Sequence, residues 1–317
     1  PMSRGLGDVY KRQPYLKKGD SVGIVCTARH LQASEITQAI QLLESWELRV
    51  VLGKTIGLKD HQFAGTDAER AADFQTMLDD KNIKAIICGR GGYGTVRMID
   101  KIDFSKFEQQ PKWIVGFSDI TVLHSHIHTN CGVATLHASM PIVFEKNTEM
   151  AIESLRKALF GEHITYETTA HDLNRVGEGS GEIIGGNLSL IYSLIGSNSD
   201  IDTSGKILVL EDLDEYLYHI DRMMMNLKRS GKLENLAGLL VGGMSDMNDN
   251  TIPFGKTAYE IIAEHTEEYN YPISFDFPVG HWPDNQALYL GKDAYIKVTK
   301  NDVYLKYDKM LLSLIHI

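Results

Sequence analysis

Short apolar runs alternate with amphipathic segments along the first half of the chain. The runs at 22–26, 49–52, 83–88, 113–116 and 133–136 have the length and composition of buried strands. The segments between them carry apolar residues at helical spacing, at 34–47, 67–80, about 95–102, 119–130 and 148–160. A Thr66-x-x-Glu69 capping box marks the start of the second of these helices. Repeated strand–helix units predict a parallel sheet covered on both faces, in a first domain spanning 14–160.

The pattern changes after residue 160. A polar, glycine-containing stretch at 161–181 is typical of a linker. From 182 to 308 the chain shows further strand–helix units and then alternating residues over 287–307, which predict closing antiparallel strands in a mixed α/β second domain. The fold class is therefore α/β with two domains, the first of flavodoxin- or amidotransferase-like type. The ends, 1–13 and 309–317, continue no neighbouring pattern and are interpreted as non-native tails.

Composition narrows the class of partner. The 317 residues carry a net charge of −10, which argues against a nucleic-acid surface or a polybasic membrane patch and favours a small ligand. Cys26, Cys88 and Cys131 lie far apart in apolar segments and form no Cys-x-x-Cys pair, so we expect buried, reduced thiols. No apolar run could span a bilayer and no charged-then-apolar leader opens the sequence. These features predict a cytoplasmic protein that binds neither nucleic acid nor membrane.

Ser118 is the first candidate for chemistry. It stands between the apolar run 112–115 and the predicted helix from Asp119, in the sequence Gly116-Phe117-Ser118-Asp119-Ile120. A strand–turn–helix junction lifts the side chain clear of the sheet and leaves the first helical N–H groups free to face a negative charge. The arrangement is that of a nucleophile elbow, although Ile120 stands where that pattern has glycine. The alternative is an ordinary helix N-cap serine.

A glycine-rich turn follows the strand at 83–88. Gly89-Arg90-Gly91-Gly92-Tyr93-Gly94 satisfies Gly-x-Gly-x-x-Gly, which could indicate a dinucleotide site. The turn follows the third strand rather than the first, and no acidic residue ends a strand about 20 residues later, so the cofactor interpretation is disfavoured. Glycine also lets backbone N–H groups approach an oxyanion closely, and a purely structural turn remains open.

Glu211 and His281 are candidates for a general-base pair. Each stands where an apolar strand of the second domain breaks into a loop, and ligands gather at such positions in α/β sheets. A base for Ser118 needs a pKa near neutrality and a partner that fixes its tautomer. On spacing alone Asp212, Asp214 or Glu215 could equally orient the imidazole, and a histidine at a strand end can be simple surface decoration.

Two further clusters are better explained by packing. His124 and His128 share a helix face with His126 between them, a spacing that can bind a metal, but no third ligand is evident and a partly buried face is favoured. The run Met223-Met224-Met225 follows Asp221-Arg222 on a predicted helix and is typical of a core-facing surface.

Five motifs together resemble the LD-carboxypeptidase family of serine peptidases, which includes muramoyltetrapeptide carboxypeptidases and microcin C immunity peptidases. The resemblance covers about residues 14–307. Its motifs, in order, are Gly89-Arg90-Gly91-Gly92-Tyr93-Gly94, Gly116-Phe117-Ser118-Asp119-Ile120-Thr121, Ile184-Gly185-Gly186-Asn187-Leu188, Leu210-Glu211-Asp212 with Ile220-Asp221-Arg222, and Pro278-Val279-Gly280-His281.

The resemblance implies a catalytic triad split between the two domains. Ser118 would be the nucleophile, His281 the general base and Glu211 the group that orients the imidazole. It also implies an oxyanion hole formed by the backbone N–H groups of Gly92 and Asp119, with no metal or cofactor.

The implied reaction is hydrolysis of the L,D-peptide bond before a terminal D-alanine of a murein tetrapeptide, by a homodimer. Arg90 and Asn187 are candidates for contacts with that peptide. Cleavage of a microcin-type acyl-nucleotide amide is the alternative within the family. A dinucleotide-dependent oxidoreductase and a non-catalytic cleft-binding protein are the alternatives outside it.

Overall fold

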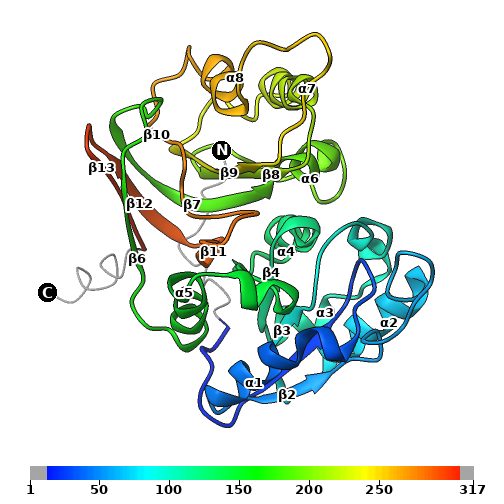
Figure 1. Ribbon diagram of the computed structural model, residues 1–317. Helices are drawn as coiled ribbons and strands as arrows, with labels where there is room; N and C mark the ends of the chain where they lie inside the picture. The colour runs from blue at the N-terminus through cyan, green and yellow to red at the C-terminus, as the bar shows by residue number, and fades with distance from the viewer. Residues whose placement is uncertain (1–12, 308–317) are drawn as a thin grey trace, which may run out of the picture.

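The computed structural model describes residues 13–307 and divides them into two lobes, each built on one sheet (Figure 1). The first sheet has the strand order β11-β5-β4-β3-β1-β2. Its parallel strands are β1 (Ser21–Val25), β2 (Arg49–Leu52), β3 (Ile83–Cys88), β4 (Trp113–Gly116) and β5 (Thr135–His137). The helices of this lobe are α1 (Thr37–Ser45), α2 (Asp67–Asp79), α3 (Ser105–Gln109), α4 (Thr121–Cys131) and α5 (Glu149–Phe160).

Helices cover both faces of the first sheet. Alternate residues of β1 belong to different apolar clusters: Ile24 packs in the cluster that contains Leu43 of α1 and Leu155 of α5, and Val25 in the cluster that contains Phe74 of α2. Burial on both faces explains why the strands are continuous apolar runs rather than alternating ones. The predicted parallel sheet is confirmed, and its carboxyl edge faces the second lobe (Figure 1).

The second sheet is mixed, with the order β10-β9-β8-β7-β12-β13-β6. Its parallel half contains β7 (Gly177–Asn187), β8 (Ile207–Leu213), β9 (Gly238–Ser245) and β10 (Ile273–Ser274), and the antiparallel half adds β12 (Asp293–Val298), β13 (Asp302–Tyr307) and β6 (Thr165–Thr169). Helices α6 (Leu188–Leu194), α7 (Leu217–Arg229) and α8 (Ala258–His265) pack on the parallel half. The mixed α/β architecture is as predicted.

The segment predicted as a linker contributes to two strands of the second sheet. Residues 161–181 contain β6 and the first part of β7, both paired in the second sheet. The glycines that suggested a loop are required by a close approach of backbones, because a Cβ on Gly179 would lie 1.9 Å from the Ala237 carbonyl oxygen and one on Gly181 would lie 2.4 Å from that of Gly205. Glycine in this stretch therefore marks contact between main chains.

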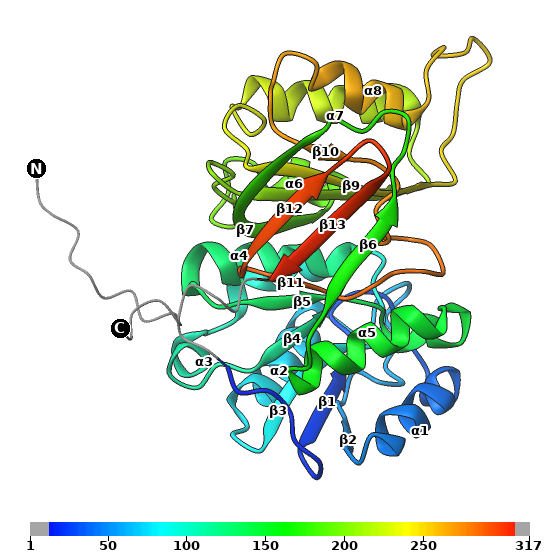
Figure 2. The ribbon, with the colours of Figure 1, turned by 90° about the vertical axis from the view of Figure 1, so that its left-hand side faces the viewer.

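After building most of the second lobe, the chain returns to the first sheet. Residues 287–307 were all predicted to close the second domain, yet β11 (Leu288–Leu290) pairs antiparallel with β5 and forms the edge of the first sheet. After β11, Lys292 lies over the rings of Tyr15, Trp113 and Tyr289, with its Nζ 3.6 Å from the Tyr289 ring centre. Figure 2 shows β11 beside β5, with β12 continuing into the upper sheet.

Smaller differences lie in the loops and at the ends. The helix predicted through residue 102 is two short 3₁₀ turns, Thr95–Arg97 and Ile99–Lys101. Gln13 is buried and donates a hydrogen bond to the Ala134 carbonyl, so it belongs to the fold rather than to a tail. The rest of the predicted tails, 1–12 and 309–317, lies outside the described residues. The three cysteines are buried and free.

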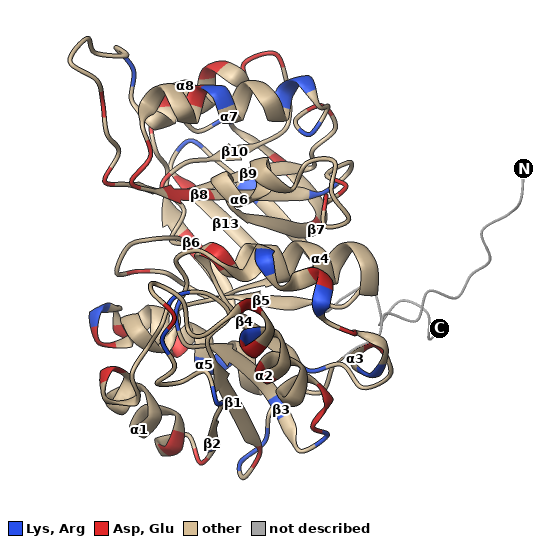
Figure 3. Ribbon diagram, turned by 90° about the vertical axis from the view of Figure 1, so that its right-hand side faces the viewer, with Lys and Arg blue, Asp and Glu red and all other residues tan. Residues whose placement is uncertain are grey.

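No helix in the 13–307 range is long and apolar enough to cross a membrane. Lys and Arg are interspersed with Asp and Glu over both lobes (Figure 3).

Substitution of Trp113 tests how much the packing around β11 contributes to stability. Its side chain is 1% exposed and lies between Tyr15 and Tyr289. We expect Trp113→Ala to lower the free energy of unfolding by about 3–5 kcal/mol, because it leaves a large cavity. Urea unfolding of this variant should be compared with Ile252→Ala, whose side chain is 85% exposed and whose effect should stay within about 0.5 kcal/mol. Equal effects would contradict the packing described here.

Candidate active site

Ser118 occupies a strained turn directly after β4. Its φ is +62°, a conformation that residues other than glycine rarely adopt. The strain is compatible with the local packing because residue 116 is glycine: a Cβ there would lie 2.8 Å from Cγ1 of Ile120. Gly116 therefore leaves the space that Ile120 fills, and the elbow forms although the usual second glycine is missing.

His281 and Ser118 meet across the two lobes. The Ser118 hydroxyl lies 3.0 Å from Nε2 of His281, and Nδ1 of His281 lies 2.6 Å from Oε2 of Glu211. Gly280 makes this approach possible, since a Cβ on it would fall 2.9 Å from Oε2 of Glu211. With Nδ1–H donating to the carboxylate, Nε2 is free to accept the serine proton.

Glu211 is inside a strand rather than at its end as predicted. Strand β8 continues to Leu213, and its pairing with β9 shifts register between Leu210 and Asp212. Such an irregularity re-aims a side chain without ending the strand, and here it coincides with the residue that contacts His281.

The neighbouring carboxylates have other partners, which settles the choice left open by the spacing. Asp212 accepts hydrogen bonds from Ser189 and from the Asn187 amide. Glu215 contacts His219 at 2.6 Å and Asp214 accepts from Asn248. Among these acidic residues, Glu211 is the one that contacts the imidazole.

Burial and charge act in opposite directions on this pair. Burial by itself would raise the pKa of Glu211, but the imidazole charge and hydrogen bond of His281 outweigh it and hold the pKa below its usual value. Burial would lower the pKa of His281, and the Glu211 carboxylate overcomes that effect and raises it. Asp212, buried beside Glu211, has its pKa raised to about 6 by burial and by that neighbouring charge.

The glycine turn is held against the elbow by buried polar contacts. The Thr95 N–H donates to Oδ2 of Asp119 at 2.8 Å, and Nη1 of the fully buried Arg70 donates to the Gly94 carbonyl at 2.8 Å. A Cβ on Gly91 would lie 3.3 Å from the Ser118 hydroxyl. Burial raises the pKa of Asp119. The turn and the start of α4 therefore stand on either side of Ser118, with Gly92 exposed.

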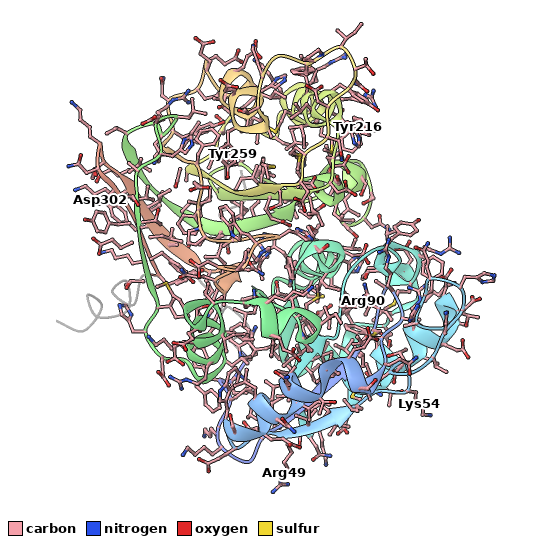
Figure 4. All side chains as sticks on the ribbon, viewed as in Figure 1. Arg49, Lys54, Arg90, Tyr216, Tyr259 and Asp302 are labelled. Carbon is pink, nitrogen blue, oxygen red and sulfur yellow. The ribbon has the colours of Figure 1, made fainter. Side chains whose placement is uncertain are left out.

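Arg90 and Asn187 have different surroundings. Arg90 is half-buried at the carboxyl end of β3, where its Nη1 donates to the His30 carbonyl at 3.2 Å, and Figure 4 shows it near the junction of the lobes. Asn187 is buried; its oxygen caps α6 through Leu190 and its amide donates to Asp212. These contacts give Asn187 a structural role next to Glu211, and its contact with substrate stays a prediction.

His137 and Asn285 were not predicted from the sequence. His137 ends β5, is fully buried, and lies close enough to Glu211 to interact with its charge; burial lowers the pKa of His137 to about 4. Asn285 accepts a hydrogen bond from the Gly280 N–H at 2.9 Å and so anchors the residue before His281. The position of His137 at the end of an apolar strand was a signal that could have identified it.

The other clusters have structural contacts. The His124 ring donates to the Gly116 carbonyl at 2.8 Å, and burial lowers its pKa to about 3. His126 contacts Ser199 instead. Within the described part of the chain, no three His, Cys, Asp or Glu side chains are grouped to hold a metal. Met223 and Met224 are buried in the core, and Met225 is exposed.

A buried carboxylate, an imidazole and a serine hydroxyl in this order can activate the hydroxyl for attack on a carbonyl, so fold and site define a hydrolase-type α/β protein. Family models for the N-terminal and C-terminal domains of LD-carboxypeptidase match residues 22–138 and 180–296. A Bacillus subtilis protein named "probable murein peptide carboxypeptidase" is 34% identical, covering 96% of this chain and 97% of its own length. The chain belongs to the LD-carboxypeptidase family.

Solved structures share the fold. Muramoyltetrapeptide carboxypeptidase from Oxalobacter formigenes matches with a TM-score of 0.83 at 23% identity, over 91% of this chain and 99% of that one. MccF in complex with glutamyl sulfamoyl guanosine matches with a TM-score of 0.83 at 20% identity, over 93% and 98%. The two-domain α/β fold predicted from the sequence is thereby confirmed.

The charge balance at His281 predicts the pH dependence of peptide hydrolysis. A base must be neutral, so kcat/KM should rise with pH through the His281 pKa, which lies above the ordinary value of about 6.5. In Glu211→Gln the carboxylate no longer opposes burial, and the midpoint of this rise should move to lower pH. The plateau rate should fall about 10²- to 10⁴-fold because the tautomer is no longer fixed. A midpoint that stays in place would contradict the coupling.

Substitution of Asp119 should lower the turnover rate rather than weaken substrate binding. Asp119→Ala removes the acceptor of the Thr95 N–H and releases the glycine turn. We expect kcat to fall about 10- to 100-fold with KM little changed. The predicted oxyanion donor on the turn, the Gly92 N–H, would be displaced but still present, and displacing such a donor costs less than removing it. Asp103→Ala, which removes an exposed carboxylate that accepts from Ser105, is the control and should leave both constants unchanged. A rise in KM alone would argue against this role.

Proposed function

We propose that this protein is a serine-type LD-carboxypeptidase, which hydrolyses the L,D-peptide bond before a C-terminal D-amino acid. The observation that carries the proposal is the continuous relay from the buried Glu211 through His281 to Ser118, with contacts of 2.6 Å and 3.0 Å. Relays of this kind convert a weak hydroxyl into a nucleophile at neutral pH.

The reaction follows from the positions of these groups. His281 accepts the proton as the Ser118 oxygen attacks the carbonyl before the terminal residue. The backbone N–H groups of Gly92 and Asp119 are the proposed donors to the negatively charged oxygen, which is supported by the packing of the neighbouring Gly91 on Ser118 and by the position of Asp119 directly after it. His281 returns the proton to the leaving amine, and water activated by the same imidazole releases the acyl group. Glu211 stays ionised and stabilises the imidazolium.

The named relatives supply the substrate class. The Bacillus subtilis relative is named for murein peptides and the Oxalobacter formigenes structure for a muramoyl tetrapeptide. We therefore propose a murein tetrapeptide with terminal D-alanine as the substrate, in peptidoglycan recycling. Action in the cytoplasm as a homodimer remains a prediction from the family resemblance.

Three alternatives lead to different products. A microcin-type immunity peptidase would cleave an acyl-nucleotide amide, and MccF, which binds glutamyl sulfamoyl guanosine, has the same fold. An oxidoreductase would use the glycine turn for a dinucleotide, but that turn follows β3 and packs on Ser118. A non-catalytic binding protein would show no turnover.

Release of D-alanine tests the proposal. Wild-type protein incubated with an L,D-tetrapeptide and no added cofactor should release free D-alanine, and Ser118→Ala should lower kcat by about 10⁶-fold. Ser34→Ala is the matched control: Ser34 is an exposed serine well before Ser118 in the sequence, and its substitution should leave kcat unchanged. Undiminished release by Ser118→Ala would refute the serine mechanism, and cleavage of the acyl-nucleotide amide alone would identify the microcin-type activity.

A further inference from the structure

Arg29 lies across the glycine turn at the reaction centre. A Cβ placed on Gly92 would fall 2.6 Å from Cδ and 2.9 Å from Nε of Arg29, so the arginine stem packs against one side of this exposed glycine. Gly92 is the residue whose N–H is assigned above to the oxyanion hole. Arg29 itself is exposed. Its side chain therefore lies at the solvent side of the turn.

The charge of Arg29 is unpaired within the protein. Arg70 and Arg97 of the same lobe share Asp67, and Arg156 pairs with Glu153 and Glu162. Across residues 13–307, the Arg29 guanidinium has neither an ion-pair partner nor a hydrogen-bond acceptor. In a chain with a net charge of −10, an arginine that finds no carboxylate of its own is a candidate for one supplied by a ligand.

A second arginine stands beside it. Arg90 begins the glycine turn and donates to the carbonyl of His30, the residue next to Arg29. No carboxylate lies within ion-pair distance of Arg90 among the residues described. The hydrogen bond ties the two arginine-bearing segments together, so two cations without acidic partners converge on one side of the glycine turn.

The substrate of a carboxypeptidase brings a carboxylate to this place. The α-carboxylate of the leaving residue is one residue beyond the scissile carbonyl, about 4–5 Å away by backbone dimensions. When that carbonyl oxygen faces Gly92, a guanidinium whose stem packs beside Gly92 can reach the carboxylate. Arginine matches a carboxylate with two parallel hydrogen bonds.

We propose that Arg29, assisted by Arg90, binds the α-carboxylate of the leaving residue and thereby restricts the enzyme to C-terminal residues. This inference rests on the proposed function and adds a specificity-determining residue to it. An internal peptide bond has no carboxylate at this position and would leave both cations without a partner.

A pair of substrates tests the assignment: an L,D-tetrapeptide with a free C-terminal carboxylate and the same peptide ending in a carboxamide. Wild-type protein should prefer the acid by about 10- to 100-fold in kcat/KM, the value of a charge-assisted hydrogen-bond pair. Arg29→Met should lose most of this preference through a higher KM for the acid, with the carboxamide almost unaffected. Arg29→Lys should be intermediate.

Other roles for Arg29 give other results, and each would overturn the proposal. If it stabilised the oxyanion, kcat would fall equally for both substrates. If it bound an acyl-side carboxylate, KM would rise equally for both. No change, or no preference in the wild type, would show that it binds no carboxylate of the substrate. Arg49→Met, at an exposed arginine on β2 at the far end of the lobe in Figure 4, is the control and should change neither substrate.

Binding to an inactive protein separates this inference from the reaction itself. In the Ser118→Ala background, calorimetry should show that Arg29→Met weakens binding of the acid by about 10- to 100-fold and leaves the carboxamide unchanged. This measurement holds whether or not Ser118 is the nucleophile. Turnover by Ser118→Ala would refute the serine mechanism, whereas equal binding of both peptides in all variants would refute the role of Arg29.

Discussion

The contact between Ser118 and His281 depends on a fixed relative position of the two lobes. The serine is carried by the first sheet and the imidazole by a loop of the second lobe, 163 positions later in the chain, and the atoms must meet at 3.0 Å. A displacement of one ångström would break the proton path, so the scaffold has to act as one body. The rest of the fold can be understood as the set of contacts that prevents such a displacement.

Several features provide that rigidity. One apolar cluster runs through both lobes, from Ile24 of β1 to Leu305 of β13. Helix α4 lies between the lobes in Figures 1 and 2, and its first residue, Thr121, accepts a hydrogen bond from the Asn187 N–H at 3.0 Å. The Asn285 side chain accepts a hydrogen bond from the N–H of Gly280, the residue before His281. Shared apolar burial and these directional contacts fix both the separation and the orientation of the lobes.

The sequence predicted what depends on local pattern and on motif. The first sheet and the serine elbow follow from apolar runs and their ends. The three residues that the family resemblance singles out, Ser118, His281 and Glu211, lie in contact, and their catalytic roles stay a prediction. What it could not predict depends on contacts between distant segments. The glycines at the start of β7 were interpreted as part of a linker, because the residues around Gly179 give no sign that its backbone packs against the Ala237 carbonyl. His137 ends an apolar strand, which the sequence shows, but its proximity to the Glu211 carboxylate of the other lobe depends on the folded structure.

The passage of the chain through β11 has a consequence for biogenesis. Strand β5 is a sheet edge until Leu288–Leu290 pairs with it, and those residues are made after almost all of the second lobe. During synthesis one edge of β5 therefore has unpaired backbone donors and acceptors. Such exposed edges can pair wrongly with strands of other chains. The chain must be made through Leu290 before β5 is paired on both sides, so the two lobes complete their folding together.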